Sequence, residues 1–228
     1  MPRTISIGDV HGCSTALSQL IIAIDPQRDD TLVMLGDYVD RGIDSKGVLD
    51  QLIELQSRLN LVPLLGNHEE ILLNARESRS NLDFFLACGG IATLDSYGSS
   101  GKLSLIPERH WTFLKSCRSY FETDRHLFLH ANYKPDVPVD ELDTQTLRWL
   151  SLWDYVPAAQ HCSGKIAIVG HTPQTSGFIL DLGYLKCIDT SCCNGGWLTA
   201  LDVETGQLWQ VSERGELKSD RDAAVSCE

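Results

Sequence analysis

Five short apolar segments of this sequence are each followed by side chains that can bind a metal ion. The segments with their polar followers are Ile7-Gly8 with Asp9 and His11, Leu35-Gly36 with Asp37, Leu65-Gly66 with Asn67, Leu129 with His130, and Val169-Gly170 with His171. One Gly-Asp after a strand is usually a turn, because both residues favour turns. A lone histidine at a strand end is more often a core residue than a ligand. If these residues had no common role, each of the five positions would have to be an independent coincidence. A shared polar site is therefore the better interpretation.

The residue types indicate the chemistry of that site. Ligands of open α/β sheets bind outside the carboxyl ends of the strands, and glycines there let the chain turn sharply. A set of carboxylates, imidazoles and one amide, without thiolates, suits Mn, Fe, Zn or Ni rather than a cysteine-based structural zinc site. Asp37 has two oxygens and could bridge two ions. Two ions about 3.5–4 Å apart favour in-line displacement at phosphorus and supply hydroxide near neutral pH.

Three further residues beside these ligands complete a hydrolytic mechanism. His68 directly follows Asn67 and could act as the general acid on the leaving oxygen. Asp40 could hold the imidazole of His68 in the right tautomer, and Arg41 offers a fork of donors for phosphate oxygens.

The order of elements around these residues predicts an α/β fold. Strands and helices alternate in the first third, which favours a parallel sheet covered by helices. The predicted elements are strand 4–7, helix 16–24 capped by Ser14 or Thr15, strand 31–35, helix 45–59 and strand 61–65. Residues 69–120 are mostly helical, broken at Gly89-Gly90 and in the loop 97–101. Strands resume at 127–129 and 166–169.

The last part of the chain predicts short antiparallel strands. These are 178–182, 184–188, 197–203 and 208–211, joined as meanders by turns at 181–183 and 204–206. We expect one domain over residues 1–211 with a helical insert at about 71–120. Residues 212–228 are polar and charged and are expected to form a frayed tail.

Chain length, net charge and the length of apolar runs indicate which classes of protein this chain can belong to. The chain has 228 residues, enough for one large α/β domain, and a formal net charge of −12. Nucleic-acid binders rely on basic patches, so this balance predicts no nucleic-acid partner. The longest apolar run, near residues 20–24, is too short for a membrane span, and no targeting segment is visible. We therefore expect a cytoplasmic protein with no membrane partner.

Eight cysteines raise the question of a disulfide framework. They form no C-x-x-C pair, and the chain is long enough to fold around an ordinary core. Reduced thiols packed as small apolar groups are the expectation. Cys192-Cys193 is the pair whose oxidation is worth watching, since vicinal cysteines near a site can oxidise.

The motifs resemble the phosphoprotein phosphatase superfamily of calcineurin-like metallophosphoesterases, over roughly residues 4–203. The matching segments are Gly8-Asp9-Val10-His11-Gly12, Gly36-Asp37-Tyr38-Val39-Asp40-Arg41-Gly42, Gly66-Asn67-His68-Glu69, His130-Ala131 and Gly170-His171-Thr172. The chain looks most like the short bacterial and bacteriophage lambda-type serine/threonine phosphatases, whose closing strands resemble residues 187–190 and 195–201.

This resemblance implies a central β-sandwich flanked by helices and two divalent ions, often manganese. It also implies a role for each motif residue. Asp9, His11 and Asp37 would hold the first ion; Asp37 would bridge; Asn67, His130 and His171 would hold the second. His68 would be the acid, paired with Asp40, and Arg41, with Asn67 and His68, would bind substrate.

One element departs from the family pattern. A second phosphate-binding arginine usually stands in a Trp-x-Arg element before the last histidine motif, but here Trp149-Leu150-Ser151 has serine at that spacing. Arg148 and Lys165 are nearby but out of register. Either another basic residue substitutes, or the substrate is held differently.

Three functions are compatible with these motifs. The first is a serine/threonine protein phosphatase that acts on phosphoproteins, with phosphotyrosine or small phosphoesters as further substrates. The second is a symmetrical dinucleoside tetraphosphate hydrolase, which resembles the same motif set. The third is a metal-binding scaffold without activity, and retention of His68, Asp40 and Arg41 argues against it.

Overall fold

Two five-stranded sheets form the centre of the protein in a computed structural model that describes residues 2–98 and 102–219. The first sheet has the order β10-β9-β1-β2-β3 and the second the order β4-β5-β6-β8-β7. The strands are β1 Thr4–Ile7, β2 Thr31–Met34, β3 Asn60–Pro63, β4 Tyr120–Glu122, β5 His126–Leu129, β6 Ile166–Val169, β7 Leu180–Asp181, β8 Leu185–Cys187, β9 Trp197–Asp202 and β10 Leu208–Ser212.

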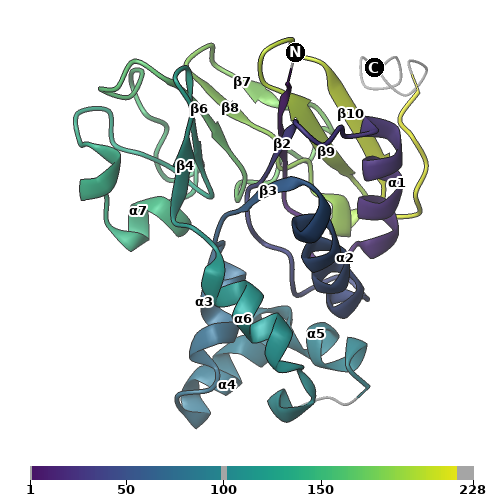
Figure 1. Ribbon diagram of the computed structural model, residues 1–228. Helices are drawn as coiled ribbons and strands as arrows, with labels where there is room; N and C mark the ends of the chain where they lie inside the picture. Colours follow the sequence, from purple (N-terminus) through teal and green to yellow (C-terminus); the bar gives the residue numbers. More distant parts are fainter. Residues whose placement is uncertain (1, 99–101, 220–228) are drawn as a thin grey trace.

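Helices cover the sheets and also form a separate cluster. The α-helices are α1 Ser14–Ile24, α2 Ser45–Arg58, α3 Asn67–Asn74, α4 Arg79–Phe85, α5 Ile91–Ser96, α6 Glu108–Ser116 and α7 Thr144–Arg148. Short helical turns lie at η1 Leu86–Gly90, η2 Leu103–Leu105, η3 Val139–Glu141 and η4 Cys192–Asn194. Figure 1 shows α1 and α2 beside the first sheet and α3 to α6 gathered below the sheets. No helix in the described ranges is long and apolar enough to cross a membrane.

Alternation along the strands explains the sandwich. Successive strand side chains point to opposite faces, so Leu32 and Met34 of β2 pack under the helices while Val33 packs between the sheets. In β5 of the second sheet, Phe128 faces the same inter-sheet core, and Leu127 packs on the outer face. The predicted α/β fold with a central β-sandwich and flanking helices is confirmed.

Pairing in the sheets is mixed, and this corrects one prediction. β1, β2 and β3 are parallel, as are β5, β6 and β8. The last four strands do not form a continuous meander: β7 and β8 join the second sheet, whereas β9 and β10 join the first. Each hairpin is local, but β8 pairs in parallel with β6 and β9 pairs antiparallel with β1. Sequence spacing alone does not reveal which sheet a hairpin joins.

Smaller differences concern element ends. Helix α1 begins at Ser14 with Cys13 at the N-cap position, so neither Ser14 nor Thr15 caps it as predicted. The hydroxyl of Ser14 instead donates to Asp44 at 2.6 Å. The strand β4 and the helix α7 were not predicted. The last predicted strand ended at residue 211, whereas β10 runs to Ser212, and Leu217 forms a bridge with Val211. The domain limits and the frayed end of the tail stay predictions, and residues 220–228 lie outside the described part.

The described cysteines are free thiols, as expected. Cys13, Cys187 and Cys192 are buried, which agrees with packing as small apolar groups. Cys227 lies outside the described residues.

Candidate metal centre

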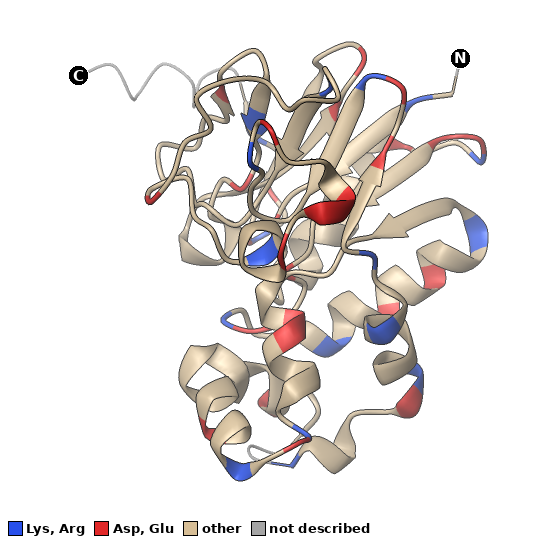
Figure 2. Ribbon diagram, turned by 90° about the vertical axis from the view of Figure 1, so that its left-hand side faces the viewer, with Lys and Arg blue, Asp and Glu red and all other residues tan. Residues whose placement is uncertain are grey.

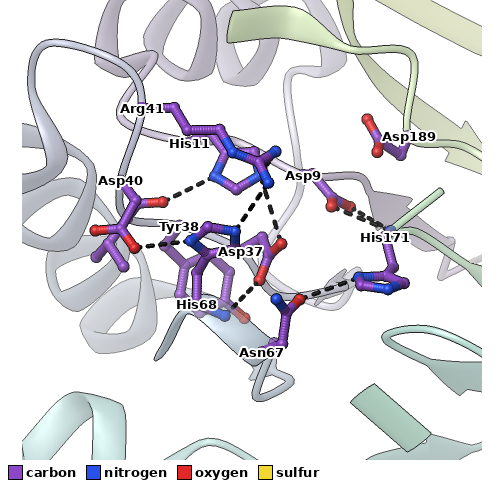
Figure 3. A network of polar contacts seen from close by, with 12 residues as sticks. Asp9, His11, Asp37, Tyr38, Asp40, Arg41, Asn67, His68, His171 and Asp189 are labelled. Atoms are coloured by element: carbon purple, nitrogen blue, oxygen red, sulfur yellow. Dashed lines mark hydrogen bonds and ion pairs between the residues drawn. The ribbon is translucent and has the colours of Figure 1, made fainter. Parts of the chain in front are cut away.

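The carboxyl ends of β1, β2 and β3 in one sheet and of β5 and β6 in the other meet at a single place. The predicted metal ligands lie there, and Figure 3 shows Asp37 in the middle of them. Ligand atoms of Asp37, His11 and His68 lie within 4.8 Å of one another, and so do those of Asp37, His130 and His171. Asp37 is shared by both groups, as a bridging ligand would be. The five strands are not successive in the chain, because β4 intervenes.

The backbone of the site is unusual. Positive φ is uncommon outside glycine and clusters at functional sites. Among the described non-glycine residues, seven have positive φ, and five of these are predicted site residues: His11 at 42°, Asp37 at 51°, Asp40 at 71°, Arg41 at 68° and His171 at 63°. The surrounding structure therefore holds the site residues in conformations that a free chain seldom adopts.

Two strand-end glycines permit close approach at the site. A Cβ at position 66 would lie 2.2 Å from Oδ1 of Asp37, and a Cβ at position 170 would lie 2.1 Å from Oδ1 of Asp9. Real Cβ atoms do not make such contacts, so a larger residue would displace either carboxylate. Glycine is therefore required at positions 66 and 170 because the carboxylates of Asp37 and Asp9 occupy the space that a side chain would fill.

Backbone carbonyls fix the tautomers of three site histidines, of which His11 and His130 are buried and His171 is partly buried. Nδ1 of His11 donates to Val39 O at 2.8 Å, and Nδ1 of His130 donates to Leu35 O at 2.8 Å. Nε2 of His171 donates to Trp149 O at 3.1 Å. A histidine that donates one N–H to a carbonyl presents the lone pair of its other nitrogen, as metal-ligating histidines do.

The other ring nitrogens of His130 and His171 both point to one acceptor atom, the side-chain oxygen of Asn67. Nε2 of His130 and Nδ1 of His171 each lie 3.0 Å from Oδ1 of Asn67. Burial lowers the pKa of His171 to about 4 and that of His11 to about 3, and it lowers the pKa of His130. Neutral imidazoles have no proton left to donate to Asn67 from these nitrogens. A divalent cation would satisfy all three acceptors, so these residues fit a metal ion.

The carboxylate of Asp37 also fits this role. Burial acts to raise the pKa of Asp37, but the imidazoles of His130, His68 and His11 outweigh burial and lower it below its ordinary value. The imidazoles become cationic at the low pH where Asp37 would protonate. Asp37 is therefore an anion at neutral pH.

Asp9 contacts the other site residues through the backbone of His171. Its carboxylate accepts the backbone N–H of His171 at 3.1–3.2 Å and belongs to neither triad of ligand atoms. Burial and the charges of Asp189 and Asp37 raise its pKa well above the ordinary value. A nearby cation would relieve that unfavourable burial of charge. The assignment of Asp9 as a metal ligand remains a prediction.

His68 and Asp40 form a buried pair. Nδ1 of His68 lies 2.7 Å from Oδ2 of Asp40, so Nε2 is the nitrogen that faces the site. Burial acts to lower the pKa of His68, but Asp37 and Asp40 outweigh it and raise that pKa. The guanidinium of Arg41 lies 2.9 Å from Nε2 of His11 and 3.0 Å from Nε2 of His68. The structure thus brings the three residues predicted for catalysis next to the predicted ligands.

The candidates to replace the missing arginine are engaged elsewhere. Arg148 lies 2.5 Å from Glu70 and 3.0 Å from Ser119, and Lys165 pairs with Glu122 at 2.8 Å. Ser151 does lie beside the last histidine motif, where its hydroxyl is 3.4 Å from that of Thr172. Arg41 is therefore the guanidinium that stands at the site in this structure.

Sequence reasoning assigned no role to three buried residues of the site. Glu69 accepts four backbone N–H groups, Thr93 contacts Asp40, and Asp189 lies beside Asp9 in Figure 3. Burial raises the pKa of Asp189 to about 6. Glu69 stands within the third motif, which could have indicated it, but Thr93 lies in a helical region that carries no readable pattern.

Comparison with known proteins places the fold and the site in a family. Residues 2–186 match the family described as calcineurin-like phosphoesterase. The chain belongs to this family. It is therefore a metal-dependent phosphatase, and the resemblance to the phosphoprotein phosphatase superfamily is confirmed. Calcineurin-like phosphoesterases use divalent metals, in agreement with the two groups of ligands.

Individual relatives carry two different names. The chain is 29% identical over 212 residues to serine/threonine-protein phosphatase 1 of Salmonella typhimurium, covering 87% of this chain and 90% of that protein. It is 39% identical over 139 residues to the symmetrical bis(5'-nucleosyl)-tetraphosphatase of Burkholderia thailandensis, covering 58% of this chain and 42% of the relative.

A solved structure supports the same fold. It carries a provisional assignment as a diadenosine tetraphosphatase and matches with a TM-score of 0.70 at 22% identity, covering 92% of this chain and 95% of that one. At this level of identity the likeness concerns the fold alone.

Proposed function

We propose that this calcineurin-like phosphoesterase is a serine/threonine protein phosphatase that hydrolyses phosphate monoesters. The observation that carries the proposal is the extent of the match with the Salmonella serine/threonine phosphatase, which covers 90% of that protein. The chain spans less than half the length of the Burkholderia tetraphosphatase. The match with the Salmonella phosphatase covers 87% of this chain, whereas the match with the Burkholderia tetraphosphatase covers 58%.

The chain's own residues suit this reaction. Two divalent ions, for which manganese is our proposal, would supply the positive charge and the hydroxide for displacement at phosphorus. Arg41 would bind phosphate oxygens through its planar fork of donors. His68 would give a proton from Nε2 to the leaving alkoxide, because Asp40 holds Nδ1 at 2.7 Å. Asp9, His11, Asp37, Asn67, His130 and His171 would hold the ions.

A symmetrical dinucleoside tetraphosphatase is the second candidate. Local identity favours it, because the relative from Proteus mirabilis is 48% identical over 71 residues. That stretch is 31% of this chain and 25% of the relative, so it leaves most of both chains outside the comparison.

A substrate panel separates the two functions. Manganese-loaded protein would be assayed on phosphoserine, phosphothreonine and phosphotyrosine peptides, on diadenosine tetraphosphate and on one aryl phosphate. We expect the highest kcat/KM on phosphoserine or phosphothreonine peptides. Higher kcat/KM on diadenosine tetraphosphate would overturn the proposal in favour of the second candidate.

A further inference from the structure

The helical insert touches the loop that carries Asp40 and Arg41. The helices α4 and α5 are separated by a break at Gly89, whose φ is 108°. The carbonyl of Gly89 accepts the backbone N–H of Arg41 at 3.3 Å. A Cβ at position 89 would lie 3.0 Å from the backbone nitrogen of Arg41 and 3.4 Å from Cβ of Asp40. The break therefore lets the insert approach this loop closely.

Thr93, on α5, makes the next contact. The residue is fully buried, and its hydroxyl donates to Oδ1 of Asp40 at 2.6 Å. The hydroxyl oxygen of Thr93 in turn accepts the backbone N–H of Asp40 at 2.8 Å. Ser45 also accepts that N–H, at 3.1 Å, but makes no bond to the carboxylate. Thr93 is thus the side chain that fixes Oδ1 of Asp40.

Asp40 transmits this contact to His68. Its second oxygen, Oδ2, lies 2.7 Å from Nδ1 of His68. The χ2 torsion of an aspartate can take a broad range of values. A hydrogen bond that holds Oδ1 of Asp40 therefore also sets the direction of Oδ2. Asp40 itself has φ of 71°, a conformation that needs support from its neighbours. One line of contacts leads from the insert through Thr93 and Asp40 to the face of His68 that points into the site.

We infer that Thr93 is a positioning residue for proton transfer, so that the insert supports the chemical step. The inference rests on the proposed acid role of His68. Thr93 holds Asp40, and Asp40 orients the imidazole toward the leaving oxygen. Removal of the hydroxyl should therefore slow reactions whose leaving group needs a proton. Reactions with a good leaving group need little protonation and should change far less.

Matched variants test this in manganese-loaded protein. Thr93→Val keeps the shape and removes the hydroxyl, Thr93→Ser keeps the hydroxyl, and Thr93→Ala is a second removal in case the valine variant folds poorly. Thr146→Val is the control, because Thr146 of α7 is also buried and bonded to an aspartate, Asp143, the N-cap of that helix. Metal content, melting temperature, kcat and KM would be measured on β-glycerophosphate and on p-nitrophenyl phosphate.

We expect Thr93→Val to lower kcat on β-glycerophosphate by roughly 10-fold or more, on the scale of one hydrogen bond to a charged group. On p-nitrophenyl phosphate kcat should fall by less than about threefold, since that leaving group needs little acid assistance. KM and metal content should stay unchanged, Thr93→Ser should restore kcat, and Thr146→Val should leave both activities unchanged. In a His68→Asn background, Thr93→Val should have no further effect.

The outcomes distinguish failure of the role of Thr93 from failure of the proposed acid role of His68. Equal losses on both substrates, or a full effect of Thr93→Val in the His68→Asn background, would overturn the role of Thr93 alone. If His68→Asn itself shows no preference between the two leaving groups, the acid role fails and this inference fails with it.

Discussion

Single side chains in this site owe their properties to backbone groups. His11 and His130 each donate Nδ1 to a carbonyl, and His171 donates Nε2, so each ring offers one defined nitrogen. The partner carbonyls at residues 39, 35 and 149 belong to segments far from these histidines in the chain. A sequence shows which residues could be ligands but not which nitrogen each presents.

The acid role of His68 gives the first prediction. His68→Asn should leave metal content intact and lower kcat on alkyl phosphates by roughly 10²–10⁴-fold, the usual scale of general acid catalysis. The loss should shrink on aryl phosphates, whose leaving groups need less protonation. Parallel kcat measurements on both substrate types check this, and an equal loss on both would count against the acid role.

The single guanidinium at the site gives the second prediction. Arg148 and Lys165 are paired with carboxylates. Among the described residues at the site, Arg41 is then the only guanidinium left to bind phosphate, and Arg41→Ala should remove that contact. A charge-assisted hydrogen bond contributes roughly 1.5–3 kcal/mol, and a bidentate fork somewhat more. That loss should appear in full in kcat/KM on an aryl phosphate.

Variants of the neighbouring residues serve as controls for that measurement. Ser151→Arg in the Arg41→Ala background should recover part of kcat/KM, because Ser151 lies beside Thr172 of the last motif. Arg148→Ala and Lys165→Ala should leave KM nearly unchanged. A raised KM in either of these, with no response to Ser151→Arg, would mean that another cation binds the phosphate.

Secondary-structure elements show why part of this site could be predicted. The predicted ligands stand where parallel strands end, and β1, β2, β3 and β6 are apolar segments that lead into glycine or Asn-containing turns. That pattern is local and visible in the sequence. The contacts of Glu69 with Tyr38 and of Thr93 with Asp40 join residues 31 and 53 positions apart, so the local pattern does not specify these partners. β4 and α7 have three and five residues, too few for periodicity to show.

Glu69 links two of these elements and gives the third prediction. Its buried carboxylate accepts N–H groups of Asp37 at 2.7 Å, Tyr38 at 2.7 Å, Val39 at 3.2 Å and Gly66 at 3.1 Å. It thus joins the loop after β2 to the start of α3. Glu69→Gln replaces an acceptor by an NH₂ group that faces these donors.

We expect Glu69→Gln to lower the free energy of unfolding by roughly 1–3 kcal/mol, the cost of buried donors left without partners. Metal content should fall as well, because the loop carries Asp37. Denaturant unfolding and elemental analysis measure the two effects. Glu77→Gln, on an exposed position, is the control and should change neither. Unchanged stability together with full metal content would show that the carboxylate does not hold the loops.

The whole molecule brings two separate sheets to one candidate metal site within a chain of net charge −12. In Figure 2, basic residues are spread over the sheets and over the helices below them instead of gathering in one area. Positive charge for a phosphate would therefore come mainly from bound ions and Arg41. The fold class followed from the order of elements, but the assignment of the final hairpins to different sheets depended on long-range pairing.

Asp37 tests the central claim most directly, because it is the one carboxylate common to both groups of ligand atoms. Elemental analysis of wild-type protein and of Asp37→Ala, each loaded with manganese and desalted, would be compared with activity on one aryl phosphate. We predict about two ions per wild-type chain, one or none in the variant, and loss of activity. Two ions per chain in Asp37→Ala, with activity retained, would contradict the account.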